Sequence, residues 1–110
     1  MDLNEYQKLA LGTMKHADGS TMRDNMLKLM FGVCGEAGEI AEVAKKHLRG
    51  DYSYSEMQEK TAAELGDVLW YVATLSNAVG LTLQELARMN VGKLASRKKR
   101  GVIRGSGSER

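Results

Sequence analysis

Two short acidic pairs are the residues of this 110-residue chain whose type and spacing could support chemistry. Glu36 and Glu39 form one pair, and Glu64 and Asp67 form the other. Residues three apart in a helix lie about 60° apart on one face. Apolar residues at helical spacing share these faces: Val33, Ile40 and Val43 with Glu36, and Met57, Val68, Tyr71 and Leu75 with Glu64. Burying carboxylates in a core costs free energy unless their charge is neutralised. A divalent cation could neutralise all four.

The ligand type narrows the choice of metal. Oxygen ligands without a cysteine partner favour Mg²⁺ or Mn²⁺ over zinc or copper, and bound Mg²⁺ often also binds substrate phosphates, which indicates phosphoryl chemistry. A di-iron bundle would use Glu-x-x-His pairs, and no histidine follows either acidic pair at that spacing. Solvated surface charge is the alternative for a single Glu-x-x-Glu pair. We assign Glu42 and Glu59 to the surface, because both rotate away from the apolar faces.

A basic row near the end of the chain is the expected counterpart of the acids. Asn90, Lys93 and Arg97 recur at spacings of three and four, so they share one helical face. Such donor groups suit phosphate oxygens. A glycine-containing basic tail that includes Arg104 follows, and it could close over a polyphosphate. A solvated basic end is the alternative interpretation of the tail.

Helical periodicity dominates the chain, and proline is absent. The pattern predicts helices over residues 3–16, 22–48, 56–79 and 82–98. Expected caps are Asp2 or Asn4, Ser53 or Ser55, and Thr82 with Glu85. Gly32, Gly35 and Gly38 predict a kink, or the close approach of another backbone or a ligand. We therefore expect an all-α protein, a small bundle of four to five helices.

Size and composition indicate one small domain, placed at residues 1–100, with a flexible tail at residues 101–110. The net charge of +2 argues against nucleic acid as a partner. No stretch has the length and apolar character of a membrane span. Cys34, the sole cysteine, is expected to be a small buried residue of a cytoplasmic protein. Trp70 is expected in the core or in an interface between copies, because a core of this size is modest.

These residues resemble the MazG-like all-α nucleoside triphosphate pyrophosphohydrolases, in particular the short single-domain members of phages and bacteria. The resemblance runs from NEYQKLA to the basic tail, and it is strongest in GEAGEIAEVAKKHLRG and EKTAAELGDVLWYVATLSNAVGLTLQELARMNVGKLASR. Glu36 and Glu39 match the last two acids of the family's E-E-x-x-E segment, and Gly35 replaces the leading glutamate. Glu64 and Asp67 match its E-x-x-D segment. The row of Asn90, Lys93 and Arg97 is similar to the family's triphosphate-contact surface.

The resemblance implies a Mg²⁺-dependent enzyme, with Mn²⁺ as a substitute, that hydrolyses a nucleoside triphosphate to the monophosphate and pyrophosphate in nucleotide-pool cleaning. All four carboxylates would hold the metal, and Glu36 or Glu39 would accept a proton from water. A homodimer or homotetramer is implied as well. An all-α dUTPase or dCTPase and a phosphoribosyl-ATP pyrophosphohydrolase are alternative enzymes. A helical interaction module and a nucleic-acid-binding module are the non-enzymatic alternatives.

Overall fold

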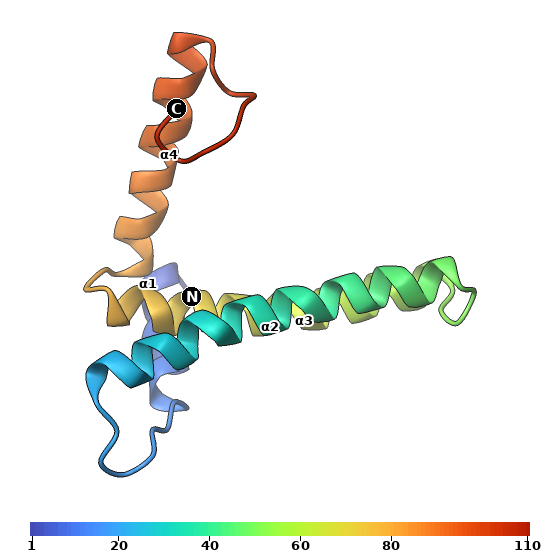
Figure 1. The fold of residues 1–110 in the computed structure, drawn as a ribbon, viewed down its shortest axis with the longest axis horizontal. Helices are drawn as coiled ribbons and strands as arrows, with labels where there is room; N and C mark the ends of the chain where they lie inside the picture. Colours follow the sequence, from blue (N-terminus) through green and yellow to red (C-terminus); the bar gives the residue numbers. More distant parts are fainter.

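The structure is a computed structural model that describes residues 1–110, and it contains four helices and no strands. The helices are α1 (Leu3–Gly12), α2 (Met22–Leu48), α3 (Tyr54–Ala78) and α4 (Leu83–Arg100). Helices α2 and α3 form a long hairpin, α1 crosses one end of it, and α4 starts at that end and points away from the hairpin (Figure 1). The prediction of an all-α protein with four to five helices is confirmed.

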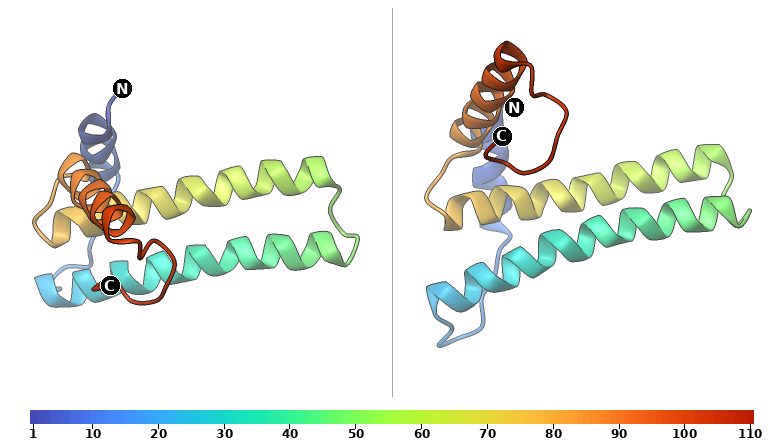
Figure 2. Two further views of the ribbon diagram at one scale, coloured as in Figure 1. Left: turned by 90° about the horizontal axis from the view of Figure 1, so that it is seen from above. Right: turned by 45° about the horizontal axis from the view of Figure 1, so that its top comes forward.

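The hairpin of α2 and α3 is the largest packed unit of the chain, and its two helices run side by side in both views of Figure 2. Apolar residues predicted to lie on the core face are covered: Val43 is buried, and Val33, Ile40 and Val68 are half-buried. Helix α2 is continuous through its three central glycines. Gly32 is the position of close approach, because a Cβ there would overlap the ring of Tyr71 on α3. Gly35 and Gly38 face open space.

A small core joins α1, α3 and α4 where the hairpin ends. Ala10, Ala73 and Leu83 are buried together, and Trp70 packs against them. Gln7 fixes the turn between α3 and α4: its Nε2 donates to the carbonyl oxygens of Ala73 at 3.0 Å and Leu81 at 3.1 Å. Its Oε1 accepts from the backbone N–H of Leu83 at 3.1 Å. The buried side chain of Gln7 thereby satisfies backbone groups that a helix start and a turn leave unpaired.

The helix ends follow local capping chemistry. Asp2, Ser53 and Thr82 are N-caps, each with a glutamate three residues later that completes a capping box. The predicted end of α1 at His16 is wrong: the helix ends at Gly12, where Thr13 donates its hydroxyl to the carbonyl of Ala10 at 2.7 Å. Glycine and threonine both disfavour further helix here.

The chain is open, and its core is small. The radius of gyration is 16.8 Å, whereas a compact chain of this length has about 13 Å. Nine of 110 residues are buried. Large apolar side chains lie exposed on the hairpin and on α4, namely Leu27, Met30, Phe31, Leu65, Leu69, Met89, Val91 and Leu94.

Cys34 is exposed too, so the prediction that it is buried is wrong for the single chain. None of the helices combines the length and apolar character that crossing a membrane requires.

The last residues return along α4 after Gly101, which has a φ of 72° and ends the helix. Arg97 is buried there, and its Nη2 donates to the carbonyl oxygen of Ser108 at 2.9 Å. Arg110 donates to the carbonyl oxygens of Val102 and Ile103 at 3.2 and 3.0 Å. The tail is therefore folded against the end of α4, and its flexibility stays a prediction.

Candidate metal site on the helical hairpin

Three carboxylates meet between the two helices of the hairpin. Glu36 from α2 and Glu64 and Asp67 from α3 each offer an oxygen, and these oxygens all lie within 4.8 Å of one another. Glu64 and Asp67 come together because residues three apart share a helix face. Glu36 reaches them because α2 runs antiparallel beside α3. Glu36 and Glu64 are half-buried, and Asp67 is exposed.

Glu39 lies outside this cluster. It is exposed and three residues further along α2, close enough for its charge to act on the carboxyl of Glu36. Three of the four predicted acids are thus brought together, and the assignment of Glu39 as a ligand stays a prediction. Because Glu39 lies beside the cluster, its carboxylate is available for a role other than holding the metal.

The electrostatics of the cluster show uncompensated negative charge. Partial desolvation raises the pKa of the Glu36 carboxyl above its ordinary value of 4.5, and the charges of Asp67 and Glu64 raise this pKa further. The two salt bridges of the chain join Lys45 to Glu42 and Arg49 to Asp51, so neither of them offsets these charges. A site of this kind attracts a cation from solution.

The donor set fits a divalent cation. Carboxylate oxygens are the ligands that Mg²⁺ and Mn²⁺ prefer. Opposite ligands of one Mg²⁺ lie about 4.2 Å apart, twice the usual Mg–O distance, and the oxygens of the cluster lie within 4.8 Å. Small movements of these side chains would therefore bring the three oxygens to a shared cation.

The predicted phosphate-binding residues lie elsewhere in the chain. Asn90 and Lys93 are exposed on α4, and Arg104 is exposed in the tail. Helix α4 packs on α1 and α3 and does not contact α2. It points away from the hairpin, so these residues and the carboxylates stand apart within one chain (Figure 1). Arg97 is engaged by the tail.

Sequence reasoning missed a cavity at the open end of the hairpin. This cavity has a volume of about 410 Å³ and lies between α2, α3 and the segment that joins α1 to α2. A smaller one of about 160 Å³ adjoins it and shares Met14, His16, Asn25 and Leu29 with it. No motif in the sequence marks these cavities, because their lining comes from three separate segments of the chain.

Fold and site define an all-α protein with a carboxylate cluster, able to hold a divalent cation, between antiparallel helices. Comparison with known proteins gives the family: the MazG nucleotide pyrophosphohydrolase domain matches residues 24–102. The chain is also similar to the Gene 37 protein of Mycobacterium phage L5, with 49% identity over 82 residues, or 73% of this chain and 72% of that protein. The chain therefore belongs to the MazG nucleotide pyrophosphohydrolase domain family, which confirms the predicted resemblance. No solved structure matched.

Proposed function

We propose that this protein is a Mg²⁺-dependent nucleoside triphosphate pyrophosphohydrolase. The observation that carries the proposal is the convergence of Glu36, Glu64 and Asp67 between two helices that lie within the matched MazG domain. Phosphoryl transfer depends mainly on positioning and on neutralising charge. A cluster of hard oxygen ligands on a rigid hairpin suits both needs.

The carboxylates have distinct tasks in this proposal. Glu36, Glu64 and Asp67 hold the cation. When bound, Mg²⁺ neutralises phosphate charge and lowers the pKa of a coordinated water. Glu39 stands beside the cluster and accepts the proton of the attacking water. Water adds its oxygen to phosphorus, the bond between the α- and β-phosphoryl groups breaks, and the products are the nucleoside monophosphate, pyrophosphate and a proton.

Asn90, Lys93 and Arg97 bind the phosphates, with Arg104 of the tail as a further contact. Because α4 points away from the hairpin of its own chain, we propose that these residues reach the carboxylates of another copy. The exposed apolar side chains of α2, α3 and α4 are the surfaces that a homodimer or homotetramer would cover. Light scattering after gel filtration tests this step, and a mass equal to one chain would exclude it.

The test of the activity is a product assay across common, damaged and noncanonical nucleotides, with and without Mg²⁺. The panel includes dUTP, dCTP and phosphoribosyl-ATP, because those substrates separate the alternative enzymes. The parent should release pyrophosphate only with the metal, and Glu39→Gln should lose this release. Glu42→Gln is the matched control, since Glu42 lies on the same helix and pairs with Lys45 on the surface. Equal activity of the parent and Glu39→Gln would remove the assignment of Glu39.

A further inference from the structure

The tail at the end of the chain covers one member of the basic row on α4. Asn90 and Lys93 are exposed, whereas Arg97 is only 9% exposed. The Nη2 of Arg97 donates to the main-chain carbonyl oxygen of Ser108 at 2.9 Å. The two salt bridges of the chain join residues of the hairpin, so the guanidinium charge of Arg97 is covered without a carboxylate partner. A buried charge without a counter-charge costs free energy, and a bound anion would remove that cost.

The side chain of Arg110 fastens the tail in this position. Its guanidinium donates to three main-chain carbonyl oxygens of the tail itself, at 3.2, 3.0 and 2.6 Å, those of Val102, Ile103 and Gly107. From α4, the Nη2 of Arg100 donates to the main-chain oxygen of Arg110 at 2.6 Å. The tail is thus a closed loop that arginine side chains join to the helix.

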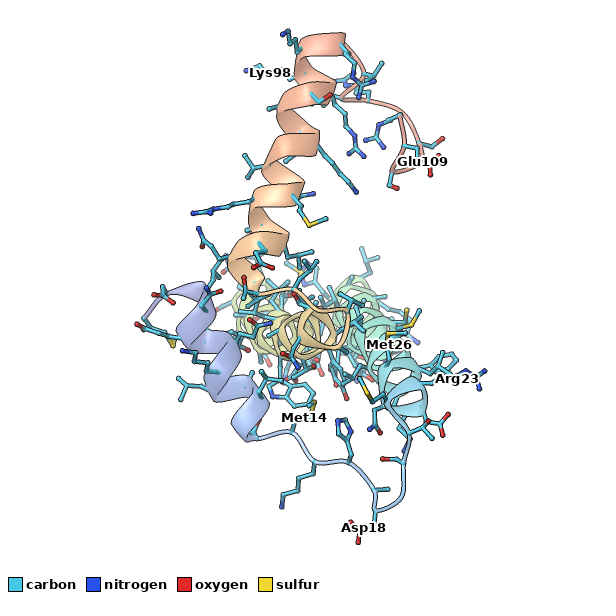
Figure 3. All side chains as sticks on the ribbon, turned by 90° about the vertical axis from the view of Figure 1, so that its left-hand side faces the viewer. Met14, Asp18, Arg23, Met26, Lys98 and Glu109 are labelled. Atoms are coloured by element: carbon cyan, nitrogen blue, oxygen red, sulfur yellow. The ribbon has the colours of Figure 1, made fainter.

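Hydrogen bonds, and not burial, hold the tail against α4. Residues 103–109 are all exposed, and Glu109, the one acidic residue of the tail, forms no salt bridge. Figure 3 shows Glu109 on the opposite side of α4 from Lys98. A segment with few buried contacts opens at a low cost in free energy. Opening of the tail would expose the guanidinium of Arg97.

A phosphate group is a stronger acceptor for Arg97 than the carbonyl that this residue contacts in the closed tail. Arginine and phosphate are both charged, and they often form two parallel hydrogen bonds. The Ser108 carbonyl is neutral and accepts a single hydrogen bond from Arg97. The tail and a phosphate therefore compete for the same guanidinium, and the phosphate displaces the tail when its concentration is high enough.

We infer that the tail, residues 102–110, is an autoinhibitory strap, which a polyphosphate displaces from Arg97 before this residue binds it. The inference rests on the proposed function, in which Arg97 is a phosphate contact. It concerns a segment outside the matched MazG domain, which ends at residue 102. Once displaced, the tail is free to carry Arg104 to the phosphates. The apparent affinity for a polyphosphate is then the intrinsic affinity reduced by the fraction of molecules whose tail is open.

Isothermal titration calorimetry of the full chain with inorganic tripolyphosphate, in metal-free buffer, tests the strap. Gly105 has a φ of 146°, and a Cβ there would lie 2.9 Å from the Cδ of Arg110. Gly105→Ala should therefore open the tail without changing any charge. This variant should bind tripolyphosphate about tenfold more tightly than the parent, as expected when a closed state of about 90% is removed. Ser106→Ala, at an exposed neighbouring position, is the matched control and should bind like the parent.

Arg110→Ala is the second variant, because it removes the three hydrogen bonds that close the tail. It should also bind more tightly, although the loss of a cation by itself weakens the binding of an anion. Lys98→Ala removes the same charge from an exposed position on α4 and should not bind more tightly than the parent. In the parent, tripolyphosphate should lower the NMR order parameters of the tail amides below about 0.6. No gain in affinity in either Gly105→Ala or Arg110→Ala would overturn the inference.

The product assay separates the strap from the proposed function. In an active protein, Gly105→Ala and Arg110→Ala should lower the KM for the nucleotide about tenfold and leave kcat unchanged, since opening of the tail affects binding. Tighter tripolyphosphate binding by these variants, in a protein that releases no pyrophosphate, would keep the strap and exclude the proposed function. Pyrophosphate release with a KM and a tripolyphosphate affinity that both variants leave unchanged would do the reverse.

Discussion

The hairpin and helix α4 differ in how much of their packing a single chain supplies. In the hairpin, carboxylates from two helices face one another and apolar residues pack beneath them. Helix α4 presents Asn90 and Lys93 to solvent and leaves Met89, Val91 and Leu94 exposed. The acidic and basic halves of the proposed phosphate site are thus packed to different degrees, and on this proposal the second half is completed by an environment that the single chain does not supply.

The largest change in activity is expected when two variants, each inactive alone, are mixed. This experiment tests most directly whether the hairpin and α4 of different chains form one site. Glu64→Gln damages the hairpin, and Lys93→Ala damages α4, so each should lower kcat/KM about 100-fold or more, as expected for groups that stabilise charge in the transition state. Refolding the two together should restore about a quarter of the parent activity, since random pairing in a two-fold assembly leaves one intact site in each mixed dimer. No recovery would place both halves in one chain and break the comparison.

Gln7→Leu should have the next largest effect, because it leaves the Leu83 N–H without its partner and removes the hydrogen bonds that the side chain donates to the carbonyls of Ala73 and Leu81. We expect a loss of about 3 kcal/mol in the free energy of unfolding, on the scale of one buried donor left unpaired and two further hydrogen bonds lost. Urea denaturation of the parent and the variant measures it. Gln84→Leu, at an exposed position on α4, should change stability little. An equal loss in both variants would contradict the role given to Gln7.

Gly32→Ala tests the packing inside the hairpin. A methyl group there overlaps the Tyr71 ring, so we expect a loss of about 1–3 kcal/mol from overpacking. Gly35→Ala adds the same methyl group where nothing lies within 4 Å, and it should stabilise by up to about 1 kcal/mol through helix propensity. Thermal unfolding of the two variants gives the comparison, and a stabilised Gly32→Ala protein would refute the close approach.

The smallest effect concerns pH. In the folded chain the pKa of Glu36 is raised above 4.5, so between that value and the raised pKa the folded state binds more protons than the unfolded state. The contribution of Glu36 to stability is therefore fully present below the unfolded pKa and is lost as pH rises through the folded pKa. Melting temperatures of the metal-free protein from about pH 4 to about pH 7 should show this decrease. The decrease should be smaller in Glu36→Gln and unchanged in Glu42→Gln.

Much of the fold followed from local patterns in the sequence, because capping boxes and apolar periodicity are short-range signals. Thr82 with Glu85 marks the start of α4 through residue type and spacing alone. The direction of α4 was not predictable, since it depends on Gln7, whose hydrogen bonds join residues more than 60 positions apart. The three clustered acids could be predicted from their spacing on helix faces. The cavity at the open end of the hairpin could not be predicted, because only the packed chain brings its lining segments together.

The unbroken course of α2 has one more consequence. Asn25 of the cavity lining and Glu36 of the carboxylate cluster belong to the same continuous helix, and the offset of eleven residues between their positions corresponds to about 16 Å of helical rise. A molecule that occupies both places must span this fixed gap. In the proposed reaction the bond beside the α-phosphoryl group breaks, and that group is attached to the sugar, so the nucleoside and not the phosphate chain would have to cover this distance.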